Sequence, residues 1–134
     1  MFTLRWLHEN GFEGFLSIKH LNDPTSRKVI PNENGVYVLF CDRDSGGIEI
    51  LYIGKAGGCS GDGRPMKTTL RKRLSAYIRQ SRSHSGGKII WELEGYSEFF
   101  VCWKRCDNPR KLETNLLTQY NELYRCLPYA NKVK

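Results

Sequence analysis

Two short apolar runs separated by a turn constrain this chain more than any other feature. The first run spans Val36–Cys41 and the second spans Ile48–Ile53, and both have the length and composition of buried strands. The residues between them, at positions 42–47, are Asp-Arg-Asp-Ser-Gly-Gly and are typical of a turn. The sequence therefore predicts an antiparallel hairpin at this place.

Two helices and a further strand are expected after the hairpin. Apolar residues recur at helical spacing from Leu70 to Ile78 and again from Leu112 to Tyr124. The second helix has a typical start, because Asn108 can cap its amino end and Pro109 suits the first helical position.

The third strand is expected at Phe99–Trp103, and residues 84–94 favour a short helix over a strand. The predicted fold is a small α/β (α+β) sandwich with a three-stranded antiparallel sheet flanked by helices, in the order β-β-α-(α)-β-α. A chain of 134 residues is large enough for one such core. We assign residues 35–134 to this domain and residues 1–34 to an N-terminal extension. Apolar residues such as Trp6 and Phe12 predict that the extension packs on the core.

The cysteines and the lengths of the apolar runs indicate the cellular compartment in which the protein is expected. The five cysteines are odd in number and include no CxxC pair, which indicates a reduced, cytoplasmic setting. A zinc site at Cys102 and Cys106 lacks a second ligand pair at suitable spacing. No run approaches the roughly 18 apolar residues of a membrane-spanning helix, and the first residues lack a signal-peptide pattern. We therefore expect no membrane partner.

Positive charge is concentrated in one segment. Residues 63–91 hold eight basic residues and no acidic one, which exceeds the net charge of +7 of the whole chain. Such an excess is typical of a surface that binds a polyanion, although a solvated face that serves solubility has the same pattern. Five of the eight are arginines, which can bind phosphate through two hydrogen bonds, and this favours nucleic acid.

Glu113 is the most informative single residue. The apolar stripe of its helix extends over about 120°, and Glu113 lies inside the stripe at about 100°. A carboxylate that faces the protein body needs a cation or hydrogen-bond donors, because burying an unpaired charge costs several kcal/mol. A metal ion, a salt bridge to a nearby Arg or Lys, or water at a cleft edge could each supply that stabilisation.

Three further residues have polar groups at the border of the expected core. Arg73 lies about 60° from Leu70, at the edge of the apolar stripe of its helix, so its stem could simply cover apolar surface. Tyr37 and Tyr52 fall on the two strands of the hairpin, where tyrosines ordinarily pack with the hydroxyl at the rim.

Five short motifs occur in an order that resembles the core of the GIY-YIG nucleases. They are Gly35-Val36-Tyr37, Leu51-Tyr52-Ile53-Gly54-Lys55-Ala56, Leu70-Arg71-Lys72-Arg73-Leu74, Glu113-Thr114-Asn115-Leu116 and Pro128-Tyr129-Ala130-Asn131. This resemblance implies a metal-dependent nuclease that hydrolyses nucleic-acid phosphodiesters, with DNA as the expected substrate. The alternative is a non-catalytic nucleic-acid-binding module on the same fold.

The resemblance also implies roles for individual residues. Glu113 would hold the divalent metal, Mg²⁺ or Mn²⁺, and Arg73 would support the phosphate. One of Tyr37 and Tyr52 would be the general base. A free tyrosine has a pKa near 10, so a base role requires nearby cations such as Lys55, expected just past the second strand, or the metal.

Other residues would assist. The resemblance implies that Tyr77 hydrogen-bonds within the site and that Asn131 braces it. Arg71 and Lys72 would contact the nucleic-acid backbone. The remaining basic residues that we expect to bind phosphate are Arg79, Arg82 and Lys88. Sequence specificity would then come from the extension, the glycine-rich loop at residues 57–63, a homodimer or a separate recognition protein.

Overall fold

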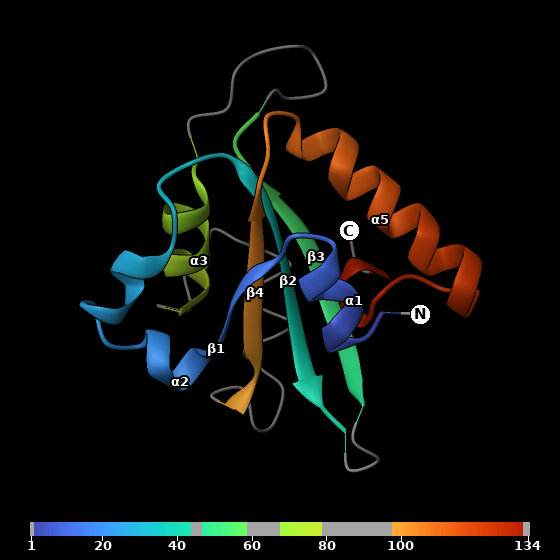
Figure 1. The fold of residues 1–134 in the computed structure, drawn as a ribbon, viewed down its shortest axis with the longest axis horizontal. Coiled ribbons are helices and arrows are strands. Elements are labelled where there is room, and N and C mark those ends of the chain that lie inside the picture. The colour runs from blue at the N-terminus through green and yellow to red at the C-terminus, as the bar shows by residue number, and fades with distance from the viewer. Residues whose placement is uncertain (1, 44–46, 59–67, 79–97, 133–134) are drawn as a thin grey trace.

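The computed structural model describes residues 2–43, 47–58, 68–78 and 98–132. Four strands form one sheet, namely β1 (Glu13–Ser17), β2 (Gly35–Asp42), β3 (Ile48–Ala56) and β4 (Phe100–Arg105). Their order is β1-β4-β2-β3, and each neighbouring pair is antiparallel (Figure 1). The mixed α/β class with an antiparallel sheet is confirmed, but the expected number of three strands is wrong.

The additional strand, β1, comes from the N-terminal extension. Its pairing with β4 shifts register between Gly14 and Leu16, and Phe15 has a positive φ of 55°. A strand with this irregularity has no clean alternation of apolar and polar residues, which is the pattern by which strands are recognised in a sequence. The extension also contributes helix α1 (Leu4–Glu9), so the element order begins before the hairpin.

The predicted hairpin is confirmed. Strands β2 and β3 pair with Tyr37 opposite Gly54 and Leu39 opposite Tyr52, and a bulge follows at Leu51. β3 continues beyond the predicted Ile53 to Ala56. Lys55 therefore lies within the strand, and the expectation that it follows the strand is wrong.

Both predicted helices are present, and their amino ends are satisfied by local contacts. α3 (Leu70–Ile78) is preceded by Thr69, whose hydroxyl accepts a hydrogen bond from the Lys72 amide at 3.3 Å. α5 (Pro109–Tyr124) has the expected cap, because the Asn108 side chain accepts from the Lys111 amide at 3.2 Å. The short helix expected at residues 84–94 lies outside the described residues.

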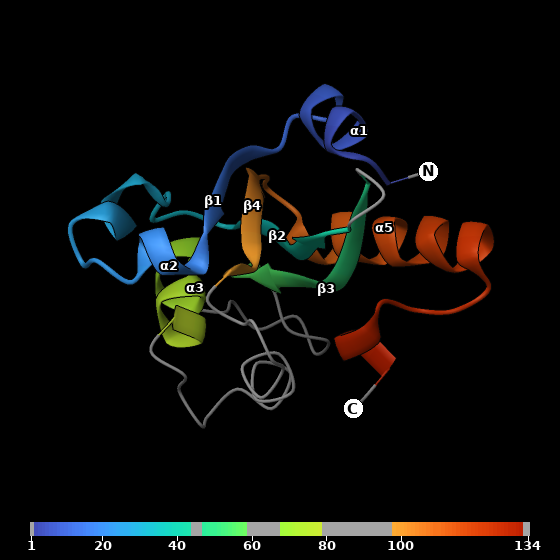
Figure 2. The ribbon, with the colours of Figure 1, turned by 90° about the horizontal axis from the view of Figure 1, so that it is seen from below.

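Helices cover both faces of the sheet (Figure 2). We call one side the α3 face, where α3, α2 (Ile18–Leu21), η1 (Ser26–Val29) and η3 (Tyr129–Lys132) lie around a core that includes Tyr37 and Trp103. We call the other side the α5 face, where α1 and α5 pack on Val36, Val38 and Phe40.

Residues 2–34 contribute to both cores: Phe2, Leu7 and Phe12 are buried on the α5 face, and Ile18, Leu21 and Ile30 on the α3 face. None of the described helices has the length and apolarity needed to cross a bilayer.

Candidate active site

The two motif tyrosines lie on the same face of the hairpin. Tyr37 on β2 and Tyr52 on β3 have ring centroids 6.0 Å apart, with the ring planes inclined by 38°. Tyr37 is 1% exposed and belongs to the core of the α3 face, whereas Tyr52 is half-buried at its border. The structure therefore brings together the two residues between which the base role was left open.

Gly54 allows this arrangement of the two rings. A Cβ on Gly54 would come within 2.5 Å of the Tyr37 hydroxyl oxygen and within 2.6 Å of Cε2 of Tyr52. Any larger residue would displace one ring or the other, because heavy atoms cannot approach so closely. The glycine therefore lets the Tyr37 hydroxyl lie directly over β3.

Glu113 is half-buried in the second turn of α5, with three cations around it. Burial raises the pKa of the Glu113 carboxyl, and the positive charges of Lys55, Arg73 and Arg110 act in the opposite direction. Burial is the dominant influence, so the charged form of Glu113 is less stable than in water. The three cations thus offset only part of the effect of burial on the carboxylate.

Arg73 has a donor that the protein does not satisfy. Its Nε is buried and has no hydrogen-bond partner in the described part of the chain. A buried donor left unpaired costs about 1–3 kcal/mol, which an anionic ligand could recover by accepting from it. Because Arg73 lies close enough to Glu113 to influence its pKa, this donor and the carboxylate belong to one site.

Asn131 is tied to the motif strand β3. Its Oδ1 accepts from the Ile53 amide and its Nδ2 donates to the Ile53 carbonyl, each at 2.8 Å. β3 is an edge strand, so this side chain pairs with backbone groups that no neighbouring strand reaches. The contact fixes the strand next to Tyr52.

The neighbouring basic residues of α3 differ in what they contact. Arg71 donates from Nε to the Ile30 carbonyl at 2.8 Å and from its terminal nitrogen to the Lys28 carbonyl at 3.2 Å. These bonds attach α3 to η1 and to the residue that follows it, so Arg71 has a structural role besides the predicted contact with the nucleic-acid backbone. Lys72 is exposed and its ammonium group can reach a ligand.

Some of the predicted residues cannot be placed relative to this site. Tyr77 lies in α3, but its side chain is outside the described part of the structure. Arg79, Arg82 and Lys88 also lie outside the described residues.

Sequence reasoning missed Arg110. It precedes Glu113 by three residues, and residues at this spacing are neighbours on a helix surface. Its charge is one of the three that stabilise the ionised carboxylate. The spacing was a usable signal, since an Arg three residues before an inward-facing Glu is well placed to interact with it.

The donor chemistry of the site fits a magnesium or manganese ion. Mg²⁺ is commonly held by one or two carboxylates, substrate phosphate oxygens and several waters. Glu113 offers such a carboxylate, and its raised pKa means that a bound cation would stabilise its charged form. No family model, no curated protein and no solved structure matches this chain.

Proposed function

We propose that this protein is a divalent-metal-dependent nuclease that hydrolyses phosphodiester bonds in nucleic acid, with DNA as the preferred class. The observation that carries the proposal is the half-buried Glu113 among Lys55, Arg73 and Arg110. A carboxylate repels phosphate, so a surface that only binds nucleic acid gains nothing from an inward acid at this place. An enzyme that positions a cation at the phosphate requires one.

The side chains of this site have complementary tasks in the proposed reaction. Arg73 donates its unpaired Nε–H to a phosphate oxygen, where negative charge increases as water attacks. Lys55 and Arg110 favour the ionised form of the Glu113 carboxylate against the effect of burial. A divalent ion held by Glu113 supplies further stabilisation of charge on the phosphate or the leaving oxygen.

Tyr37 is the proposed general base for the attacking water, and Tyr52 is the alternative. The Tyr37 hydroxyl lies over Gly54, one residue from Lys55 in the strand. Tyr52 is the more exposed of the two and adjoins the residue that Asn131 holds. Removing one hydroxyl at a time distinguishes which of the two tyrosines is the base.

The test is a cleavage assay on supercoiled, linear, branched and single-stranded DNA, with and without Mg²⁺ or Mn²⁺. We expect metal-dependent cleavage by the natural chain and none by Glu113→Gln, with nucleic-acid binding retained or tighter because a negative charge is lost. Glu122→Gln is the matched control, since Glu122 is an exposed acid on the same helix. Cleavage by Glu113→Gln at the natural rate would refute the assignment. Binding without any cleavage would favour the non-catalytic module.

A further inference from the structure

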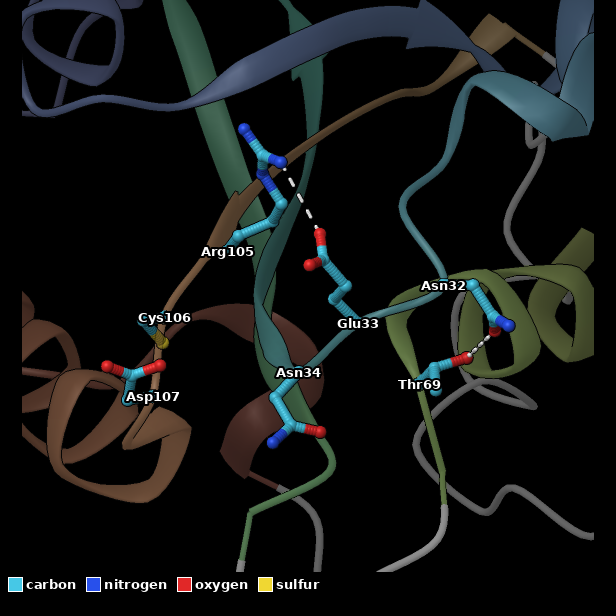
Figure 3. Close-up of a pocket in the computed structure, with 7 residues that line it drawn as sticks. All are labelled: Asn32, Glu33, Asn34, Thr69, Arg105, Cys106 and Asp107. Atoms are coloured by element: carbon cyan, nitrogen blue, oxygen red, sulfur yellow. Dashed lines mark hydrogen bonds and ion pairs between the residues drawn. The ribbon is translucent and has the colours of Figure 1, made fainter.

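A polar pocket of about 620 Å³ lies where β2 begins and β4 ends (Figure 3). The pocket is lined by polar side chains from three segments of the chain, namely Asn32, Glu33, Asn34, Thr69, Arg105, Cys106 and Asp107. Its volume falls in the range of about 300–1,000 Å³ that is usual for sites binding small organic groups.

This pocket adjoins the candidate active site through both of its helices. Thr69 immediately precedes α3, and its carbonyl accepts from the Arg73 amide at 2.9 Å. Asp107 lies two residues before α5, the helix of Glu113. A ligand that spans from the pocket to Arg73 and Glu113 therefore has to cross only the first turns of these helices.

The strand that carries the second tyrosine motif also ends against the pocket. Gly57 directly follows β3 and has a φ of +81°. A Cβ at Gly57 would overlap the Asn34 Oδ1 and lie 2.8 Å from the Thr68 carbonyl oxygen. The backbone therefore leaves the active-site strand in contact with a side chain that lines the pocket.

The charges in the pocket do not suit a phosphate. Its described lining includes one cation, Arg105, and two carboxylates, Glu33 and Asp107. Arg105 is already engaged by Glu33 at 3.4 Å and by Glu13 at 3.5 Å, as the dashed line to Glu33 marks in Figure 3. An anion placed here would meet an uncompensated negative charge. A ligand group for this pocket should therefore carry no negative charge and should donate hydrogen bonds.

The polar atoms that remain available are mainly acceptors. The Asp107 carboxylate makes no hydrogen bond or ion pair with the described residues, and the same holds for the side-chain amide of Asn34. The Asn32 Oδ1 already accepts from the Thr69 hydroxyl at 2.7 Å. A carboxylate and an amide together can bind a flat group that offers N–H donors beside an acceptor.

We propose that this pocket binds an unpaired nucleobase that carries an exocyclic amine, on the strand that is cut. A carboxylate accepts from the amino group of cytosine, and an amide pairs with the amino group and ring nitrogen of adenine. In a duplex these groups face the major groove, so a base can enter a pocket only by leaving the stack, which costs least in single-stranded or distorted nucleic acid. The inference rests on the proposed nuclease function and specifies its substrate as nucleic acid with an unpaired base near the cut.

The test uses nucleosides, which contain no phosphate, in titrations followed by two-dimensional ¹⁵N NMR on the full chain. With cytidine and adenosine we expect saturable shifts of the backbone amides of residues 32–34 and 105–107. Uridine, which has no exocyclic amine, should bind about tenfold more weakly. Absence of saturable shifts at these residues, or equal binding of uridine, would overturn the proposal.

Asp107→Asn sharpens the test by replacing a pure acceptor with a group that also donates. Asp107 is exposed, so the substitution should leave the dispersed spectrum of a folded protein unchanged. We expect binding of cytidine to weaken about tenfold, while Glu122→Gln, which changes an exposed acid on α5 away from the pocket, leaves it unchanged. Unchanged cytidine binding by Asp107→Asn would contradict the assignment of the carboxylate.

The result of the nucleoside titration is independent of the result of the cleavage assay. A protein that cleaves DNA but shows no shifts in the titration would retain the nuclease proposal and lose the base pocket. One that binds cytidine and adenosine but never cleaves would retain the pocket and lose the nuclease.

Discussion

The two faces of the sheet differ in the polar groups that they bury. On the α5 face, strand β2 presents Val36, Val38 and Phe40, and the helices add apolar and aromatic side chains. On the α3 face, the same strand presents Tyr37 and Leu39. Both buried nitrogens that lack a hydrogen-bond partner in the described residues, Arg73 Nε and Trp103 Nε1, occur on this face. Both faces stabilise the fold with buried apolar side chains, and the α3 face in addition holds buried polar groups whose lack of a partner lowers stability.

The strongest test of this contrast is Phe40→Ala on the α5 face. Phe40 is 2% exposed, and its ring stacks on Phe100 with centroids 5.6 Å apart. Truncating a buried phenylalanine typically costs about 3–5 kcal/mol, so the free energy of unfolding in urea should fall by that amount. Cleavage per folded molecule should remain near the natural value. A large loss of activity in the folded variant would mean that the α5 face shapes the site.

The opposite outcome is expected for Arg73→Met on the α3 face. The change removes the unpaired Nε and keeps an apolar stem, so stability should not fall and could rise by up to about 1–3 kcal/mol, the cost of the unpaired donor. Cleavage should slow by about 10²–10³-fold, which is typical of losing one donor to transition-state charge.

Arg71→Met is the matched control. It breaks two hydrogen bonds to the Ile30 and Lys28 carbonyls, so it should lower stability by about 1–3 kcal/mol and affect the chemical step less. If both variants lost activity equally, Arg73 would have no special role.

The next smaller effect on the rate of cleavage is expected from removing the hydroxyl of Tyr37 or Tyr52. Tyr37→Phe and Tyr52→Phe each remove one hydroxyl and keep the ring packing, so stability should fall by about 1 kcal/mol or less. Tyr37→Phe should slow the chemical step by about a hundredfold, the usual contribution of a positioned base. Single-turnover rates against pH identify the role, because loss of the general base removes one limb of the profile. If Tyr52→Phe shows this behaviour and Tyr37→Phe does not, the assignments are exchanged.

Features that depend on neighbouring residues were predictable from the sequence, and features that depend on distant residues were not. The hairpin and the capped start of α5 follow from residues adjacent in the chain, such as Asn108 and Pro109, so local rules suffice. Strand β1 pairs with a segment more than 80 positions away, and its irregular backbone conceals the alternation of a strand.

The candidate site could likewise be predicted only where its features depend on residues close together in the chain. Helical spacing pointed to Glu113 and Arg73 because each lies on one helix stripe. The hydrogen bonds of Arg71 and the pairing of Asn131 with Ile53, 78 positions apart, arise only from tertiary packing. Gly54 likewise has a role only after two rings converge on it.

The smallest expected effect is the pH dependence that Glu113 gives to stability. Because burial raises the pKa of Glu113 in the folded protein, the folded state binds a proton more readily than the unfolded state. Stability should therefore fall as pH rises from the unfolded pKa, near 4.3, through the higher folded pKa. It should not change further once the carboxyl is ionised in both states.

Glu113→Gln should remove this slope and make the protein more stable than the natural chain at neutral pH. The measurement is the free energy of unfolding in urea at several pH values, without divalent ions. Adding Mg²⁺ should then raise the Tm of the natural chain and not that of Glu113→Gln, because a cation on the carboxylate stabilises its ionised form. If Mg²⁺ raised both values equally, the ion would bind elsewhere and Glu113 would not be its ligand.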